Sequence, residues 1–335
     1  MRRIDRRDLL ICACGPLIMP LASFAQQTGK VRHIGFLSLD SPDSEIGLAT
    51  RTLFPEALKQ LGYVEGDNLV IDWRWGNGRP ADLPGLAAAL VQSKVELIVA
   101  RNNGSIAAAI QATKSIPIVM FSGNYPVDVG FIKSFAHPGG NVTGTSFLPS
   151  ADMSAKQLQL LQELVPAARR IAVLRNANTI GTVFGDVVYG SVGRTATRLG
   201  MSVQYFDVYA SDEVGAALEA IVTTGISTMW YGGDPIFRAR TAEIMAFLGT
   251  HRIAAIATIP TFAEAGGLAH YAPDGRDSFF RSAIYVDRIL KGTSPSELPV
   301  EGPTKYEFAI NLKTANLLGI KVPRSLLARA TKVID

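Results

Sequence analysis

The sequence predicts an α/β fold made of two doubly wound parallel-sheet lobes joined by crossing segments. Three observations predict it. The chain has 335 residues, which exceeds the usual size of one domain. Its residues are 47% hydrophobic and 19% charged, a composition that can bury a large core. From Arg32 onward, short apolar runs alternate with longer helical patterns, as in parallel sheets covered by helices on both faces.

The first series of elements predicts a lobe over residues 31–147. The expected elements are, in order, a strand at 32–39, a helix at Ser44–Leu61, a strand at 68–75, a helix at Asp82–Gln92, a strand at 95–101, a helix at Ser105–Thr113, and strands at 116–122 and 141–147.

A second series with the same alternation predicts a second lobe from residue 148. Its expected elements are a helix at Met153–Leu164, a strand at 169–176, a helix near Gly185–Leu199, a strand at 202–208, a helix at Glu213–Val222, a strand at 226–233, a helix at Pro235–Leu248 and a strand at 253–259.

The remaining residues are too few for a third domain, so we expect them to cross back and complete the two lobes. They contain a helical pattern at Arg276–Lys291, a proline-rich stretch and a strand-like run at 306–312. The predicted first lobe is therefore 31–147 plus about 274–300. The predicted second lobe is 148–273 plus about 301–335.

The N-terminal segment predicts a cleavable signal peptide over residues 1–25. Four arginines within the first seven residues precede an apolar run from Leu9 to Ala22, which is shorter than the roughly 20 residues needed to span a bilayer. We expect cleavage after Ala25 and a periplasmic protein, with either the general or the twin-arginine export route. Lipid attachment at Cys12 is the alternative, but the apolar stretch before it is only three residues long.

Composition excludes several classes of function. Both cysteines, Cys12 and Cys14, lie in the segment predicted to be removed, which excludes disulfide, thiol and thiolate–metal chemistry. Residues 1–25 also hold four arginines and two aspartates, so the net charge falls from +4 to +2 without them. A nucleic-acid partner is therefore not expected.

Motifs for catalysis, metals and cofactors are not expected either. The four histidines lie far apart in the sequence, without metal-ligand spacing, and no nucleophile elbow or phosphate-binding P-loop occurs. Residues 76–81 match a dinucleotide fingerprint by letter, but they do not follow the first strand, and Pro80 lacks an N–H. We predict no catalytic residue, no metal and no cofactor.

Polar residues at the ends of the apolar runs are the candidates for ligand binding. In open α/β sheets, ligands bind outside the carboxyl ends of the strands. Each such residue could instead be a helix cap or a turn former, so only their joint position favours a ligand. The predicted ligand-binding residues are Ser38, Asp40, Asn102, Asn103, Ser105, Ser122, Asn124, Tyr125, Asn176, Tyr231, Asp234 and Thr258.

Two turns carry most of this hypothesis. The turn after the strand at 95–101 presents backbone N–H groups and the positive end of a helix dipole. These groups could bind a phosphate or a carboxylate, or they could serve only to form the turn. In the stretch "WYGGDP", Pro235 starts a helix and leaves Asp234 as its cap. Asp234 could also pair with a cationic group of a solute, with Tyr231 against the apolar part of that solute.

Several long stretches resemble a known family. "LGYVEGDNLVIDWRWGNGRPADLPGLAAALVQSKVELIVA", "HPGGNVTG", "YVDRILKG" and "LPVEGPTKYEFAINLKTANLLGIKVPRSLLARA" closely resemble the ABC-transporter substrate-binding proteins of the tryptophan/tyrosine type (TrpX-like). The resemblance implies a type 1 periplasmic-binding-protein fold and a membrane permease as partner. It also implies that Asn103, Gly104 and Ser105 hold a ligand carboxylate and that Asp234 holds an ammonium group. The turn "NNGS" departs from the family's usual G-T-P pattern, and "GNYPV" replaces a shorter turn.

The predicted function is therefore extracytoplasmic capture, between the two lobes, of a small polar or amino-acid-like solute, aromatic ones included. The protein, expected to be a monomer and not an enzyme, would deliver the solute to an ABC-transporter permease. Amino acids, aromatic acids, nucleobase-like compounds and small amides all fit such a site. A sensor of the same fold that feeds a signalling receptor is the first alternative, and an enzyme that uses the interlobe cleft is the second.

Overall fold

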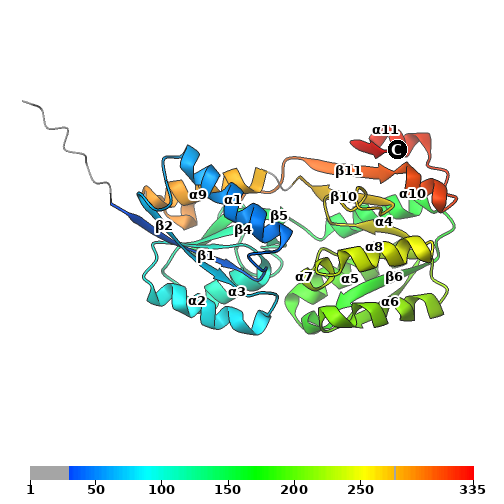
Figure 1. The fold of residues 1–335 in the computed structure, drawn as a ribbon, viewed down its shortest axis with the longest axis horizontal. Helices are drawn as coiled ribbons and strands as arrows, with labels where there is room; N and C mark the ends of the chain where they lie inside the picture. Colours follow the sequence, from blue (N-terminus) through cyan, green and yellow to red (C-terminus); the bar gives the residue numbers. More distant parts are fainter. Residues whose placement is uncertain (1–29, 275–276) are drawn as a thin grey trace, which may run out of the picture. The chain divides into compact units, whose positions relative to one another are not determined.

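A computed structural model describes residues 30–274 and 277–335 of the chain (Figure 1). The predicted signal peptide lies outside the described residues. Within the described residues the strands form two sheets, one of five and one of seven strands. We call each sheet with its helices a lobe, the first and the second in chain order.

The first sheet is entirely parallel, as the sequence predicted, and has the strand order β2-β1-β3-β4-β5. Its strands are β1 (Arg32–Ser38), β2 (Leu69–Trp75), β3 (Ile98–Ala100), β4 (Ile118–Asn124) and β5 (Val142–Leu148).

Helices cover both faces of the first sheet (Figure 1). One face is covered by α1 (Glu45–Gln60) and α9 (Asp277–Leu290), over a core that includes Phe36 and Phe54. The other is covered by α2 (Leu83–Gln92) and α3 (Asn103–Ala112), over an aliphatic core. The helix α9 therefore completes the first lobe from a position late in the sequence.

The second sheet has the order β12-β11-β10-β9-β8-β6-β7. Its strands are β6 (Arg170–Asn176), β7 (Ser202–Val208), β8 (Thr228–Tyr231), β9 (Ala254–Ala257), β10 (Ala269–Pro273), β11 (Tyr306–Asn311) and β12 (Lys332–Ile334). The pair β10–β11 is antiparallel, whereas the other pairs of this sheet are parallel, as the sequence predicted. The strand β11 enters the sheet after a passage through the first lobe, so it runs in the opposite direction.

The second lobe has two cores, one on each face of its sheet. One includes Trp230 and lies under α4 (Asp152–Leu164) and α5 (Val183–Arg198). The other includes Tyr231 and lies under α6 (Val214–Thr223), α7 (Pro235–Arg238) and α8 (Thr241–Thr250). Successive strand residues point to opposite faces, so these two neighbouring aromatic residues enter different cores.

Two predicted helices differ from the structure, and three elements were missed. The single helix expected at Pro235–Leu248 is two helices, α7 and α8, because the chain leaves helical geometry at Arg240. The helix expected to open at Ser105 begins at Asn103, with Asn102 as its cap. After β11 the structure adds α10 (Leu312–Leu317), α11 (Arg324–Arg329) and β12, none of which was predicted.

The chain passes between the lobes where β5 leads to α4, where β10 leads to α9, and where the segment after α9 leads to β11. Glu301 on the last passage still pairs with Thr145 of β5. The crossing segments agree with the predicted architecture, and the residue boundaries of the two lobes stay a prediction.

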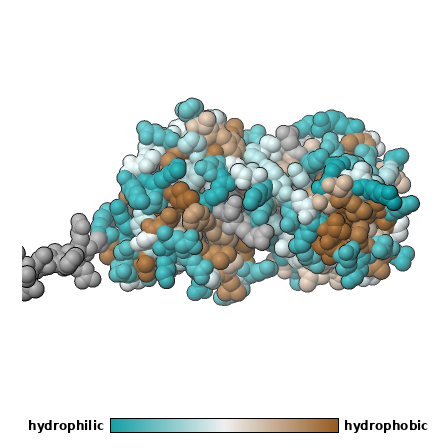
Figure 2. All heavy atoms as spheres, turned by 90° about the horizontal axis from the view of Figure 1, so that it is seen from above, coloured by the Kyte–Doolittle hydropathy of each residue, from teal (hydrophilic) through white to brown (hydrophobic). Residues whose placement is uncertain are grey.

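In the described part of the chain, no helix combines the length and the apolarity needed to cross a membrane. Figure 2 shows hydrophilic residues over most of the face it views, with apolar residues in separate groups. Exposed large apolar side chains, such as Leu317 and Val183, come from different elements.

Candidate ligand-binding site

The strand orders place one topological switch point in each sheet. In the first sheet the winding direction reverses between β1 and β3, and in the second it reverses between β6 and β8. The loops at the carboxyl ends of such strand pairs leave a crevice between them, which is where ligands bind in this class of sheet. The residues that follow these four strands therefore form the candidate site.

A buried ion pair spans the first switch point. Asp40 follows β1, and its Oδ2 accepts a hydrogen bond at 3.1 Å from Nε of Arg101, which follows β3. The hydroxyl of Ser38 donates to the same Oδ2 at 2.9 Å and accepts from the Asp40 backbone N–H. Only 7% of the Asp40 side chain and 10% of the Arg101 side chain are exposed. Burial lowers the pKa of Arg101 to about 10, and the Asp40 charge opposes this shift.

The turn that follows Arg101 is held by two asparagines. Asn102 caps α3, because its Oδ1 accepts from the backbone N–H of Ser105 at 3.1 Å and from the Ser105 hydroxyl at 3.0 Å. Asn103 makes two reciprocal bonds with the backbone of Asn124 at the end of β4, at 2.9 and 2.8 Å. Four of the predicted residues therefore lie together, namely Asn102, Asn103, Ser105 and Asn124. Ser122, another predicted residue, is half-buried in β4.

A hydrogen bond spans the second switch point. Nδ2 of Asn176, the last residue of β6, donates to Oδ2 of Asp234 at 2.9 Å. The other carboxylate oxygen of Asp234 accepts from the Ile236 N–H at 3.1 Å, so Asp234 caps α7 as predicted. Burial raises the pKa of Asp234 above its ordinary value, and the two hydrogen bonds and Arg238 oppose this shift.

The other predicted residues lie deeper. The Thr258 hydroxyl accepts from the Gly233 N–H at 3.0 Å and so supports the turn before Asp234. Tyr231 is fully buried against Phe237 and Phe262. Tyr125 is 1% exposed, with its ring 6.3 Å from that of Phe184 of the second lobe. Ligand contact by these three side chains stays a prediction.

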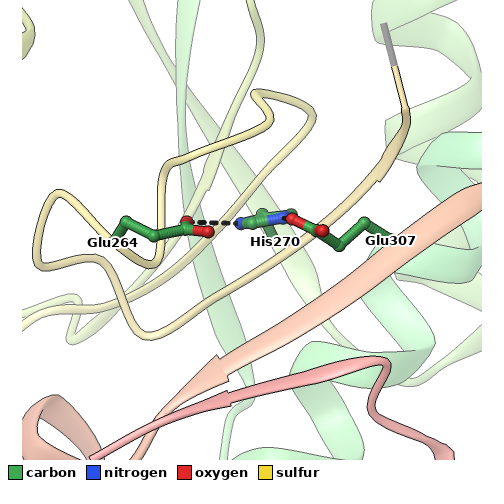
Figure 3. A group of neighbouring side chains, drawn as sticks. All are labelled: Glu264, His270 and Glu307. Atoms are coloured by element: carbon green, nitrogen blue, oxygen red, sulfur yellow. Dashed lines mark hydrogen bonds and ion pairs between the residues drawn. The ribbon is translucent and has the colours of Figure 1, made fainter. Parts of the chain in front are cut away.

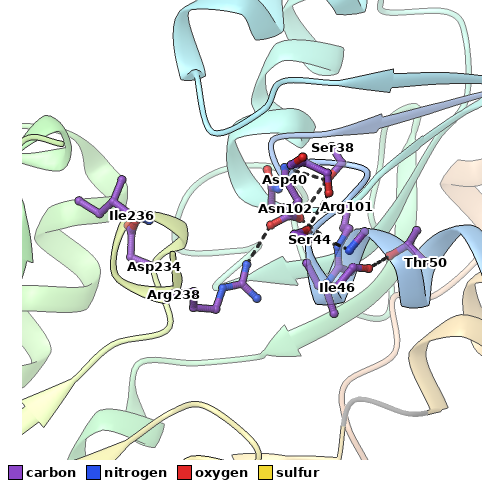
Figure 4. A network of polar contacts seen from close by, with 12 residues as sticks. Ser38, Asp40, Ser44, Ile46, Thr50, Arg101, Asn102, Asp234, Ile236 and Arg238 are labelled. Atoms are coloured by element: carbon purple, nitrogen blue, oxygen red, sulfur yellow. Dashed lines mark hydrogen bonds and ion pairs between the residues drawn. The ribbon is translucent and has the colours of Figure 1, made fainter. Parts of the chain in front are cut away.

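Arg238 connects the two switch points. It is the last residue of α7, and its NH2 atom lies 3.2 Å from Oδ1 of Asp40. Figure 4 shows its guanidinium directed away from α7 toward Asp40, next to Asn102, while Asp234 lies at the start of the same short helix. Sequence reasoning did not select Arg238, whose side chain contacts Asp40 and which lies on the short helix that Asp234 caps.

Arg101 and Trp75 were missed as well. Arg101 is the last residue of the strand predicted at 95–101, next to the turn that we singled out, and it was not among the predicted ligand-binding residues. Trp75 ends β2 beside Ser38, and its ring stacks on Trp73 at 5.7 Å and 9° and lies 5.9 Å from that of Phe36. A half-buried tryptophan at the carboxyl end of a strand is a signal that the predicted list could have included.

A further polar cluster contains Glu264, His270 and Glu307. It lies at β10 and β11, away from the switch point between β6 and β8. His270 is fully buried, and Figure 3 shows the two carboxylates on opposite sides of its ring. Nε2 lies 3.0 Å from Glu307, whereas Nδ1 accepts from the Ala263 N–H at 3.3 Å. Lys332 pairs with Glu264. His270 and Glu307 thus connect β10 to β11, and the pair of Glu264 with Lys332 connects the loop before β10 to β12.

Two doubly wound lobes with polar pairs at both switch points define a two-lobed binding protein, and the fold is that of the type 1 periplasmic binding proteins. The chain belongs to the ABC transporter substrate-binding protein family, whose model matches residues 38–334. This is a family of binding proteins rather than enzymes, in agreement with the sequence-based expectation.

Three relatives illustrate the similarity. A tyrosine-binding protein from Clostridioides difficile is 29% identical over 268 residues, covering 80% of this chain and 76% of the relative. A Streptococcus pneumoniae protein in complex with L-Trp has a TM-score of 0.80 at 23% identity, with 90% of this chain and 99% of that chain covered. The ligand-free, open structure of a Clostridium difficile substrate-binding protein with adhesive properties has a TM-score of 0.64 at 26% identity, with 91% and 99% covered.

Proposed function

We propose that the protein binds an aromatic α-amino acid between its two lobes and delivers it to an ABC-transporter permease. Family membership supports the delivery role. Relatives named for tyrosine binding or solved with L-Trp support the ligand class. The observation that carries the proposal is the pair of polar clusters at the two switch points, which present fixed groups of both signs.

These groups match the two charges of an α-amino acid. The first turn of α3 offers backbone N–H groups and a helix N-terminus to a carboxylate. In the second lobe, Asp234 offers a carboxylate whose ionised form is disfavoured by burial. A ligand ammonium next to Asp234 would compensate that buried charge, which is a physical reason for the site to prefer an amine.

The aromatic part of the ligand would lie against the first lobe. Trp75 is half-buried at the carboxyl end of β2 and belongs to a cluster of aromatic rings with Phe36, Trp73 and Phe121. Aromatic side chains favour offset or edge-to-face contacts with other rings. Trp75 is therefore our preferred aromatic contact, ahead of the fully buried Tyr231.

The proposal includes the cellular setting. We propose that residues 1–25 are a cleavable signal peptide, that the mature protein is periplasmic, and that it acts as a monomer. Mass measurement of the exported protein tests the first point, with a start near Gln26 as the expected result. Lipid on Cys12 would contradict it.

The function is tested by direct binding. The mature protein is purified, denatured mildly, and the released small molecules are identified by mass spectrometry. Thermal stability is then measured with L-tyrosine, L-tryptophan, L-phenylalanine, L-leucine, L-glutamate and glucose. An aromatic amino acid at 100 times its dissociation constant should stabilise the protein by about 2.7 kcal/mol. Stabilisation by glucose or L-glutamate alone would contradict the proposed ligand class.

A further inference from the structure

Arg238 differs from the other charged groups at the switch points because it leaves its own lobe. Its side chain is 33% exposed, and its NH2 atom lies 3.2 Å from Oδ1 of Asp40, whose side chain is 7% exposed. Arg238 belongs to α7 of the second lobe, and Asp40 follows β1 of the first. This ion pair therefore depends on how the lobes are arranged, whereas the pair of Asp40 with Arg101 lies within one lobe.

Asp40 keeps its compensation when Arg238 withdraws. Its Oδ2 is bound by Arg101 at 3.1 Å and by the Ser38 hydroxyl at 2.9 Å, so the buried carboxylate retains a cation and a donor in its own lobe. Arg238, one-third exposed, can return its charge to water at small cost. The contact between the lobes can thus break without leaving an unpaired buried charge, which is the usual penalty for such a change.

A second carboxylate, that of Asp234, caps the helix on which Arg238 lies. Its backbone N–H donates to the Asp234 carbonyl at 3.0 Å, and its charge lowers the pKa of Asp234 against the effect of burial. The Asp234 carboxylate itself is bound by Asn176 and Ile236. With Arg238 directed at Asp40, as Figure 4 shows, Asp234 carries no direct ion pair with this arginine.

The solved relatives include one in complex with L-Trp and one described as ligand-free and open. The structure is more similar to the relative in complex with L-Trp, at a TM-score of 0.80, than to the ligand-free, open relative, at 0.64. The second of these has the higher sequence identity, 26% against 23%.

We propose that Arg238 is a positioning residue for closure: its ion pair with Asp40 stabilises the arrangement in which the lobes enclose the solute and leaves Asp234 available to the ligand ammonium. The inference rests on the proposed function for the identity of the ligand, but not for the closure itself. Apparent affinity scales with the population of the binding-competent arrangement. Loss of a partly exposed ion pair should therefore weaken binding by up to roughly fivefold.

The test compares Arg238→Gln, Arg238→Lys and the control Arg240→Gln. Arg240 stands two residues away, but it pairs within its own lobe with Glu243 and the Ser211 carbonyl. The chain has cysteines only at positions 12 and 14. Cysteines introduced at the exposed Thr52 of α1 and Thr250 of α8 therefore place two spin labels on the mature protein, one on each lobe. Electron–electron distances are measured without added ligand, and L-tryptophan and L-tyrosine affinities are measured by calorimetry.

In Arg238→Gln we expect longer interlobe distances without ligand and weaker binding, at an unchanged melting temperature. Arg238→Lys should restore most of both properties, and Arg240→Gln should match the wild type. High salt should lengthen the wild-type distances and leave those of Arg238→Gln unchanged. Unchanged distances in Arg238→Gln would overturn the inference, whether or not affinity falls. If neither amino acid binds the wild type, the proposed ligand class fails, while the distance measurement still decides the role of Arg238.

Discussion

The two switch points of this protein use different chemistry in the same topological position. At the first, a buried carboxylate and a buried guanidinium, Asp40 and Arg101, compensate each other across β1 and β3. At the second, Asp234 receives only neutral donors, from Asn176 and from the backbone of Ile236. Charge is thus satisfied inside the first lobe and left partly unsatisfied in the second. A ligand cation has more to gain at the second.

The largest effect that would break this comparison is expected for Asp40→Asn. The substitution leaves Arg101 buried without its counter-ion and removes the partner of Arg238. Breaking a buried ion pair by removing one partner typically costs about 3–5 kcal/mol. Chemical denaturation should show a loss of that size. Asp43→Asn, an exposed change nearby, is the control and should stay within about 0.5 kcal/mol of the wild type. If Asp40→Asn lowers the free energy of unfolding by less than about 1 kcal/mol, the Asp40–Arg101 pair contributes no more than a surface ion pair.

Asp234→Asn should have the opposite profile. Asparagine caps a helix about as well as aspartate, so the melting temperature without ligand should not fall. Removing the charge from a desolvated pair with a ligand ammonium typically costs about 2–5 kcal/mol, or roughly thirtyfold to several thousandfold in affinity. Calorimetry with the aromatic amino acid that binds the wild type measures this. Unchanged affinity would reduce Asp234 to a helix cap and remove the difference between the two lobes.

The smallest effect concerns the pH dependence of stability. Burial raises the pKa of Asp234 above its ordinary value of 3.8. Between that value and the raised one, the folded protein binds more protons than the unfolded chain, so this group makes stability fall as the pH rises. Denaturation of wild type and Asp234→Asn across pH should therefore give equal stabilities at the acidic end, and a relative advantage of the variant that grows through this window. An advantage that shrinks with rising pH would show that the Asp234 carboxylate is net stabilised in the fold.

The sequence predicted the parts of this fold that depend on local patterns. Ser44 was read as the start of a helix, and it caps α1 through the Gly47 N–H. The apolar runs of both series became strands, because parallel strands covered on both faces are apolar on both sides. The same property hid the orientation of Tyr231. In a run that is apolar on both faces, nothing local says which core each residue enters.

The pairing of charged residues could not be predicted from the sequence. Asn176 and Asp234 were both selected because each follows a strand, but their contact depends on β6 and β8 being neighbours. Arg238 meets Asp40 across 198 positions of the chain. That contact depends on the arrangement of two lobes, to which no local signal refers. The break between α7 and α8 was missed for a related reason, because Pro235–Leu248 has an acceptable helical pattern throughout.

The late position of the segments that complete both lobes has a consequence for biogenesis. The helix α9 covers the first sheet from residues 277–290, and β11 and β12 complete the second sheet, with Asn311 in register with Ile334. A chain emerging from its N-terminus therefore cannot finish the first lobe before starting the second. Both lobes are completed by long-range contacts only after nearly all of the polypeptide has been released, and such contacts form slowly. During that interval the unfinished sheets expose apolar faces, so the maturing polypeptide would need protection from aggregation until its last residues are in place.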